Sequence, residues 1–129
     1  MKTLLAASAT LVALSFPAFA AGDAAKGEKE FNKCKACHMI ASESETIVKG
    51  GKTGPNLYGV IGRTAGSVEG FSYSDGLAAK GAEGLVWDEA ELAAYVADPN
   101  EYLGSRSKMT FKLAKGAEDV AAYLATFSQ

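Results

Sequence analysis

Apolar residues recur with a helical period at the C-terminal end of the chain. Four of them follow the spacing i, i+3, i+4 and i+7, which is one face of an α-helix: Val120, Tyr123, Leu124 and Phe127. This stripe predicts a closing helix from about Ala117 to Phe127.

A second helix is predicted near the other end of the chain. Asp23 is a suitable N-cap for a helix that runs to about Lys33. Gly27 and Phe31 are four residues apart and therefore share one face of this helix. Because glycine permits close approach, we expect the two terminal helices to pack against each other.

Between these helices the pattern predicts loops and three short helices. Glycines interrupt every apolar run from 39 to 73, so we expect this stretch to be loop without regular strands. Ser74 or Asp75 can start a helix that runs through Lys80 and ends at Gly81.

Two aspartates are predicted to open the next helices. Asp88 begins a capping box for a helix that runs to about Ala97. Asp98 precedes Pro99, a favoured first helical residue, and Gly104 ends that short helix. Together these patterns predict an all-α domain of about five short helices joined by glycine-rich loops.

Residues 1–20 are predicted to be a removable export signal. Lys2 provides the positive start, residues 4–14 form an apolar run, and residues 18–20 read Ala-Phe-Ala, a small-x-small cleavage pattern. A membrane anchor is the alternative, but the apolar run is shorter than the roughly 20 residues that span a bilayer. We therefore expect a single domain at 21–129, without a membrane anchor, in the bacterial periplasm.

The charge of the mature chain is unevenly distributed. Without Lys2 it has twelve basic and fifteen acidic residues, a formal charge of −3. Residues 64–101 contain eight acidic residues and one lysine, whereas residues 102–117 contain four basic residues and no acidic one. This asymmetry indicates a dipolar molecule with one basic face. Nucleic acid is an unsuitable partner for so acidic a chain.

Both cysteines and the only histidine lie within five positions, Cys34-Lys35-Ala36-Cys37-His38. Two thiols at this spacing can add to the vinyl groups of a haem, and the following imidazole can ligate its iron. A dithiol redox motif is an alternative, but it expects a strand-helix-strand setting and leaves His38 unexplained. A structural zinc site needs four ligands, and no second Cys or His pair exists. The motif therefore predicts one covalently bound haem c.

Met109 is the predicted second axial ligand. Met1 is lost with the export signal, and Met39 adjoins His38 at a Cα spacing of about 3.8 Å, so it stays on the histidine side of the ring. Core packing is the alternative role for any methionine. A His/Met pair raises the reduction potential and fills both axial positions. This ligation predicts a one-electron carrier that is not an enzyme.

Other side chains are candidate partners of the haem or its ligands. The Pro55 carbonyl is free to accept the second nitrogen of His38, and Tyr95 can hydrogen-bond the sulfur of Met109. Several donors can meet the haem propionates: Tyr58, Arg63, Tyr73, Ser74 and Trp87. For each of these alone, ordinary packing or a solvated surface position is the alternative.

Over its whole mature length the chain resembles the class I c-type cytochromes, and it is most similar to the bacterial cytochromes c2 and their mitochondrial relatives. Six stretches carry the resemblance in order: Phe-Asn-Lys-Cys-Lys-Ala-Cys-His at 31–38, Lys-Thr-Gly-Pro-Asn-Leu-Tyr-Gly at 52–59, Gly-Arg-Thr-Ala-Gly at 62–66, Phe-Ser-Tyr-Ser-Asp at 71–75, Gly-Leu-Val-Trp-Asp at 84–88 and Lys-Met-Thr-Phe at 108–111. The loop at 39–52 is longer than in the mitochondrial relatives.

The resemblance implies a cytochrome c fold wrapped around one haem. It implies His38 and Met109 as axial ligands, a hydrogen bond from His38 to the Pro55 carbonyl, and one from Tyr95 to the Met109 sulfur. It also implies that the N-terminal helix crosses the C-terminal helix at Tyr123. Propionate contacts are implied near four residues: Arg63, Tyr73, Trp87 and Ser107.

Members of this family carry electrons from the cytochrome bc1 complex to a photosynthetic reaction centre or a terminal oxidase. We expect this chain to be a monomer that docks transiently on such partners through a ring of lysines, although each lysine alone can be simply solvated. The six lysines flank the haem-attachment and methionine segments: Lys33, Lys35, Lys52, Lys108, Lys112 and Lys115. The alternative function is the haem subunit of a periplasmic oxidoreductase, such as a sulfur-oxidising enzyme, which should show a large apolar surface patch.

Overall fold

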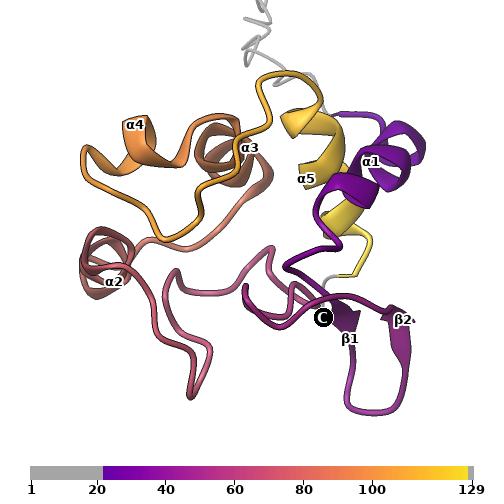
Figure 1. Cartoon of the computed structure of the whole chain (residues 1–129), viewed down its shortest axis with the longest axis horizontal. Helices are drawn as coiled ribbons and strands as arrows, with labels where there is room; N and C mark the ends of the chain where they lie inside the picture. Colours follow the sequence, from indigo (N-terminus) through magenta and orange to yellow (C-terminus); the bar gives the residue numbers. More distant parts are fainter. Residues whose placement is uncertain (1–21, 128–129) are drawn as a thin grey trace, which may run out of the picture.

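The computed structural model describes residues 22–127, and the predicted export signal lies outside this range. Within it, five short α-helices are joined by long loops that include one small β-hairpin (Figure 1). The helices are α1 (Ala24–Glu30), α2 (Asp75–Ala82), α3 (Glu89–Ala97), α4 (Pro99–Leu103) and α5 (Ala117–Ala125). The predicted all-α class with about five helices is therefore confirmed.

The first helix begins where the sequence predicted. Asp23 caps α1 by accepting hydrogen bonds from the backbone N–H groups of Ala25 at 2.9 Å and Lys26 at 3.2 Å. The chain then tightens into a 3₁₀ helix, η1 (Phe31–Lys33), so the predicted end near Lys33 is correct. This tighter turn leads directly into the segment that contains both cysteines.

The end of α2 differs from the prediction. Ser74 caps the helix as expected, with its hydroxyl accepting from the N–H of Leu77 at 3.4 Å, but the helix passes through Gly81 to Ala82. A Cβ at Gly81 would lie 2.0 Å from the carbonyl oxygen of Ala65. The close approach of this loop requires a glycine at position 81, so Gly81 does not mark the end of the helix; the chain turns at Gly84, where φ is +95°.

The capping aspartates of α3 and α4 act as predicted. Asp88 accepts from the N–H of Glu91 at 2.7 Å, and Asp98 accepts from the N–H of Glu101 at 3.2 Å. Gly104 ends α4 in the left-handed conformation, with φ of +64°. The boundaries of both helices match those expected from the sequence.

The expectation of an unbroken loop from 39 to 73 was wrong in one part. Strand β1 (Ile40–Ala41) pairs antiparallel with β2 (Thr46–Val48), with Ile40 opposite Val48 and Ala41 opposite Thr46. Strands of two and three residues are too short to produce a recognisable alternation of apolar and polar positions. The hairpin directly follows the cysteine segment in the chain and lies at the lower right of Figure 1.

Helices α1 and α5 lie side by side, although they are at opposite ends of the sequence (Figure 1). Gly27 faces α5 so closely that an added Cβ would lie 1.9 Å from the carbonyl oxygen of Asp119 and 2.8 Å from Cβ of Tyr123. The rings of Phe31 and Tyr123 pack with centroids 5.7 Å apart. The predicted packing of the terminal helices is thus confirmed, while α5 ends at Ala125, two residues earlier than expected.

The close contact predicts that Gly27→Ala destabilises the protein, although alanine favours helix over glycine by about 1 kcal/mol. Two helix backbones must separate to admit the new methyl group. We expect the free energy of unfolding to fall by about 2 kcal/mol, as overpacked cores do, in guanidinium unfolding followed by circular dichroism.

Gly76→Ala in α2 is a matched control. A Cβ there would clash with the hydroxyl oxygen of exposed Ser105, at 2.4 Å, but this terminal group can rotate away, and the contact with Leu103 at 3.5 Å is ordinary packing. The control should be neutral or slightly stabilising. Equal losses in both variants would contradict a backbone contact at Gly27.

Candidate cofactor-binding site

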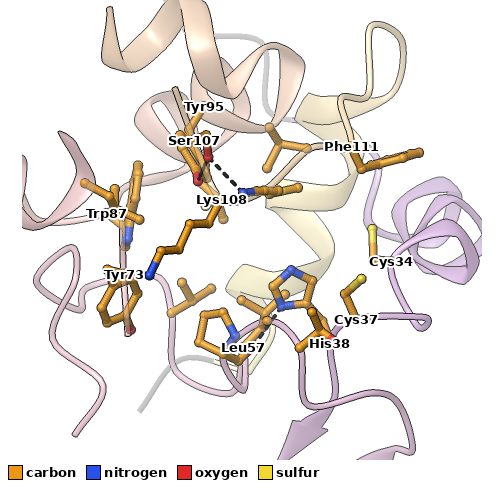
Figure 2. Close-up of a pocket in the computed structure, with 18 of the residues that line it drawn as sticks. Cys34, Cys37, His38, Leu57, Tyr73, Trp87, Tyr95, Ser107, Lys108 and Phe111 are labelled. Atoms are coloured by element: carbon orange, nitrogen blue, oxygen red, sulfur yellow. Dashed lines mark hydrogen bonds between the residues drawn. The ribbon is translucent and has the colours of Figure 1, made fainter. Parts of the chain in front are cut away.

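One large cavity lies between the helices and is lined from almost every part of the chain. Its apolar walls come from η1, α2, α3, α5 and the loop before α2: Phe31, Leu57, Val60, Phe71, Leu77, Leu92, Val96, Val120 and Leu124. Figure 2 shows the two cysteine sulfurs and His38 on one side of this space, and Tyr73 and Trp87 on the other.

Cys34, Cys37 and His38 lie on one tight turn after η1. The N–H groups of Cys37 and His38 both donate to the carbonyl of Cys34, at 3.1 and 2.9 Å. Cys34 is buried and Cys37 is exposed at the cavity edge. Burial raises the pKa of the Cys34 thiol to about 11, and the nearby Glu30 carboxylate adds to this shift. These surroundings favour an uncharged sulfur, such as that of a thioether.

The imidazole of His38 is oriented by the chain around Pro55. Its Nδ1 lies 2.8 Å from the Pro55 carbonyl oxygen, and since a carbonyl only accepts, Nδ1 is the protonated nitrogen. Burial lowers the pKa of His38, and the charge of Arg63 acts in the same direction, while the bond to Pro55 opposes them. The ring is therefore neutral, with Nε2 available as a metal ligand.

Met109 lines the same cavity, whereas Met39 does not. Ser107 holds the Met109 segment: its hydroxyl accepts from the N–H of Met109 at 3.0 Å, and its own N–H donates to Oδ1 of Asn100 at 2.7 Å. The Tyr95 hydroxyl lies 3.1 Å from the Ser107 hydroxyl (Figure 2). The expected bond from Tyr95 to the Met109 sulfur stays a prediction; in the structure the Tyr95 hydroxyl contacts the Ser107 hydroxyl.

Most of the expected propionate donors line the cavity. Arg63, Tyr73, Ser74, Trp87 and Ser107 all contribute to its wall. Arg63 is partly buried, which lowers the pKa of its guanidinium. The hydroxyl of Tyr73 accepts from the N–H of Val68 at 3.1 Å and keeps its own proton to donate.

The structure does not place Tyr58 where the sequence prediction of a propionate donor requires it. It does not line the cavity, and its ring packs on Phe127 with centroids 6.5 Å apart. The neighbouring Leu57 faces the cavity instead (Figure 2). Adjacent residues in this irregular segment point in opposite directions, and no period in the sequence indicates which one faces inward.

Sequence reasoning also missed contributors at the opening of the cavity. Thr53, Thr110 and Phe111 line it and are exposed or nearly so, with 41% of Phe111 accessible to solvent. The proximity of residues 110 and 111 to Met109 was the only available signal. Together with exposed Cys37, they mark the side on which a bound cofactor would reach the surface.

The six expected docking lysines are all exposed, but their surroundings differ. Lys33 and Lys108 line the cavity opening. Lys33 contacts Glu30 at 2.8 Å, Lys112 lies 3.6 Å from Asp98, and Lys108 donates to the Ser72 hydroxyl at 3.0 Å. The charges of Lys33 and Lys112 are therefore partly compensated within the protein.

The lining of the cavity fits a haem. Its wall is mainly apolar, it opens beside two thiols at the haem-attachment spacing, and a neutral imidazole and a thioether both reach into it. Among residues 22–127, no group of three or more His, Cys, Asp or Glu side chains could hold a metal ion, so nothing there supports a structural zinc site.

Known proteins that are similar in sequence and structure agree with that assignment. Cytochrome c2 of Rhodobacter capsulatus is 56% identical over 132 residues, covering 96% of each chain, and cytochrome c-550 of Paracoccus versutus is 53% identical, covering 99% of this chain and 90% of that protein. The solved structure of the Rhodobacter capsulatus protein superposes with a TM-score of 0.79 at 58% identity, over 81% of this chain and 97% of the other. No family model matches the chain.

Proposed function

Because this chain belongs to the cytochrome c2 family, whose members are electron carriers with one covalently attached haem c, we propose that it is a periplasmic one-electron carrier with His38 and Met109 as axial ligands. The observation that carries the proposal is the cavity that brings the Cys34–His38 turn and Met109 together from distant parts of the sequence. When bound, the haem iron supplies the one-electron redox couple.

The protein holds the two ligands by different means. His38 is fixed from behind by the Pro55 carbonyl, and Met109 is fixed through its backbone by Ser107. A neutral thioether favours the reduced iron more than a second imidazole would. With both axial positions filled, the site would exchange electrons without binding oxygen or peroxide.

Polar groups at the inner wall of the cavity can compensate the negative charge of the haem propionates. Arg63 provides a partly buried positive charge, and Tyr73, Trp87 and Ser107 provide neutral donors. Ser107 already bonds to Tyr95 and to the Met109 backbone. A propionate bonded to Ser107 would therefore be linked directly to the methionine segment.

The opening of the cavity is the proposed route for electrons and the proposed docking face. Exposed Cys37 and Phe111 lie at this opening, flanked by Lys33 and Lys108. We propose the cytochrome bc1 complex as electron donor, and a photosynthetic reaction centre or terminal oxidase as acceptor. Transient docking suits a carrier that must leave each partner quickly.

This docking face predicts rates that depend strongly on salt. Raising the ionic strength from about 0.01 to 1 M shortens the Debye length from about 30 to 3 Å. We expect the second-order rate of reaction with the isolated bc1 complex or reaction centre to fall at least about tenfold, as for other electrostatically steered associations. Stopped-flow or flash spectroscopy measures this rate.

Lysine variants locate the face. Lys35→Gln and Lys52→Gln should slow the reaction at low salt, whereas Lys80→Gln carries the same charge change in α2 and should have little effect. Of the two lysines that line the cavity opening, Lys33 and Lys108, we expect replacement of Lys33 by glutamine to slow the reaction less, since Glu30 already compensates its charge. Rates that are insensitive to salt would show that docking does not use this face.

A monomer in the periplasm is the proposed state of the mature protein. The export signal predicted at 1–20 supports this location. No helix among residues 22–127 combines the length and apolarity that a membrane span requires. Determining the N-terminal residue of protein purified from periplasmic extract would test the predicted cleavage before Ala21.

A further inference from the structure

The side chain of Asn56 makes three hydrogen bonds to backbone groups, two of them to a strand fifteen residues earlier in the sequence. Its side-chain amide binds both backbone groups of Ala41: Nδ2 donates to the Ala41 carbonyl at 2.7 Å, and Oδ1 accepts from the Ala41 N–H at 3.1 Å. Oδ1 also accepts from the N–H of Tyr58 at 3.1 Å. The side chain thus acts like an extra strand residue that attaches the segment after Pro55 to β1.

The same segment is fixed from its other side. Arg63 donates from Nη1 to the carbonyls of Asn56, at 3.1 Å, and Tyr58, at 3.4 Å. The N–H of Leu57 donates to the Met39 carbonyl at 3.0 Å. Side chains and backbone together leave the peptide between Pro55 and Asn56 little freedom to move.

This segment touches His38 directly. An added Cβ at Gly54 would lie 2.3 Å from Cε1 of the imidazole, and the Pro55 carbonyl oxygen is 2.8 Å from its Nδ1. The carbonyl belongs to the peptide bond whose nitrogen is that of Asn56. A displacement of Asn56 therefore moves the acceptor of the His38 hydrogen bond.

We propose that Asn56 is a positioning residue that sets the reduction potential by holding the Pro55 carbonyl against His38. The β-hairpin has a role in this arrangement, because β2 pairs with β1 and fixes Ala41 opposite Thr46. The inference rests on the proposed ligation by His38. It assigns to Asn56 and to the hairpin an effect on the iron that neither exerts by contact with the cofactor.

The expected direction follows from the chemistry of the imidazole. A strong bond from Nδ1–H to a carbonyl increases the basicity of Nε2. A more basic ligand stabilises the oxidised, more positive iron and lowers the reduction potential. Loosening Asn56 weakens the bond and should raise the potential.

Asn56→Ala tests the proposal, with Asn100→Ala as a matched control. Asn100 also uses its side chain to hold a backbone N–H, that of Ser107, but on the methionine side. The readouts are the reduction potential and the NMR resonance of the His38 Nδ1 proton in the oxidised holoprotein. Asn56→Ala should shift that resonance and move the reduction equilibrium about threefold to tenfold towards the reduced form, a tenfold change being 59 mV for one electron.

Asn100→Ala should leave the His38 Nδ1 proton unchanged. The proposal is overturned if Asn56→Ala leaves both readouts at their wild-type values, or if the control shifts the His38 proton equally, which would indicate general loosening. Should Asn56→Ala fail to mature, Asn56→Ser keeps one short polar group and should give a smaller shift in the same direction. A wild-type His38 proton without any paramagnetic shift would instead refute the ligation by His38 itself.

Discussion

Replacing both attachment cysteines, by Cys34→Ser together with Cys37→Ser, should leave a chain that is largely unfolded. Within residues 22–127, ten of the eighteen buried apolar residues line the cavity and would lose their main packing partner without haem. Removing one buried aromatic side chain costs about 3–5 kcal/mol, and a porphyrin is several times larger. The loss is comparable with the whole stability of a small domain, about 5–15 kcal/mol.

Circular dichroism of the purified double variant measures this effect directly. We expect most of the helical signal to be lost and the cooperative unfolding transition to disappear. Cys37→Ser alone is the control, because one thioether still holds the ring in the cavity and the helices should persist. Native helix content in the double variant would show that the polypeptide folds without the cofactor.

Met109→Ala should lower the reduction potential and open the iron to external ligands. Axial ligands together set haem potentials over a range of about 0.8 V, so losing a thioether should cost on the order of 0.2 V. Met109 reaches the cavity from a segment fixed by Ser107, and an alanine there presents no donor atom. Redox titration, and carbon monoxide binding to the reduced protein, would measure the two effects.

Met39→Ala is the matched control, since Met39 lies beside His38 in sequence but outside the cavity. It should keep the potential close to that of the wild type and bind no carbon monoxide. Met109→His should close the iron again at a low potential, which separates loss of the sulfur from general damage to the site. A visible spectrum unchanged by Met109→Ala would reject Met109 as the ligand.

Much of the helical framework could be predicted because its signals are local. Asp23, Ser74, Asp88 and Asp98 each cap a helix through hydrogen bonds to N–H groups two or three residues away. Such bonds depend only on residues that are close in sequence. The end of α2 was missed because the glycine at position 81 is required by a contact with Ala65, sixteen residues earlier, and not by a turn.

The site was predictable only in part, for a similar reason. Tyr58 was assigned from the chemistry of its hydroxyl, but its ring packs on Phe127 outside the cavity, whereas Tyr95 on α3 lines the cavity as expected. In an irregular loop, no periodicity indicates which side chain faces inward. Residues such as Leu57, which form the apolar wall, carry no distinctive chemistry in the sequence.

The sequence by itself determined the covalent chemistry. Cys34, Cys37 and His38 are close because they are adjacent, and Met109 was the one methionine that could reach the opposite face. The tertiary structure alone decided how those groups are supported, through the hydrogen bonds of the Asn56 side chain to Ala41 in β1 and the contact of the Tyr95 hydroxyl with Ser107 near Met109. The covalent chemistry depends on residues that are close in sequence. The supporting contacts depend on where segments distant in sequence meet, which is set by packing around the cavity and not by any local pattern.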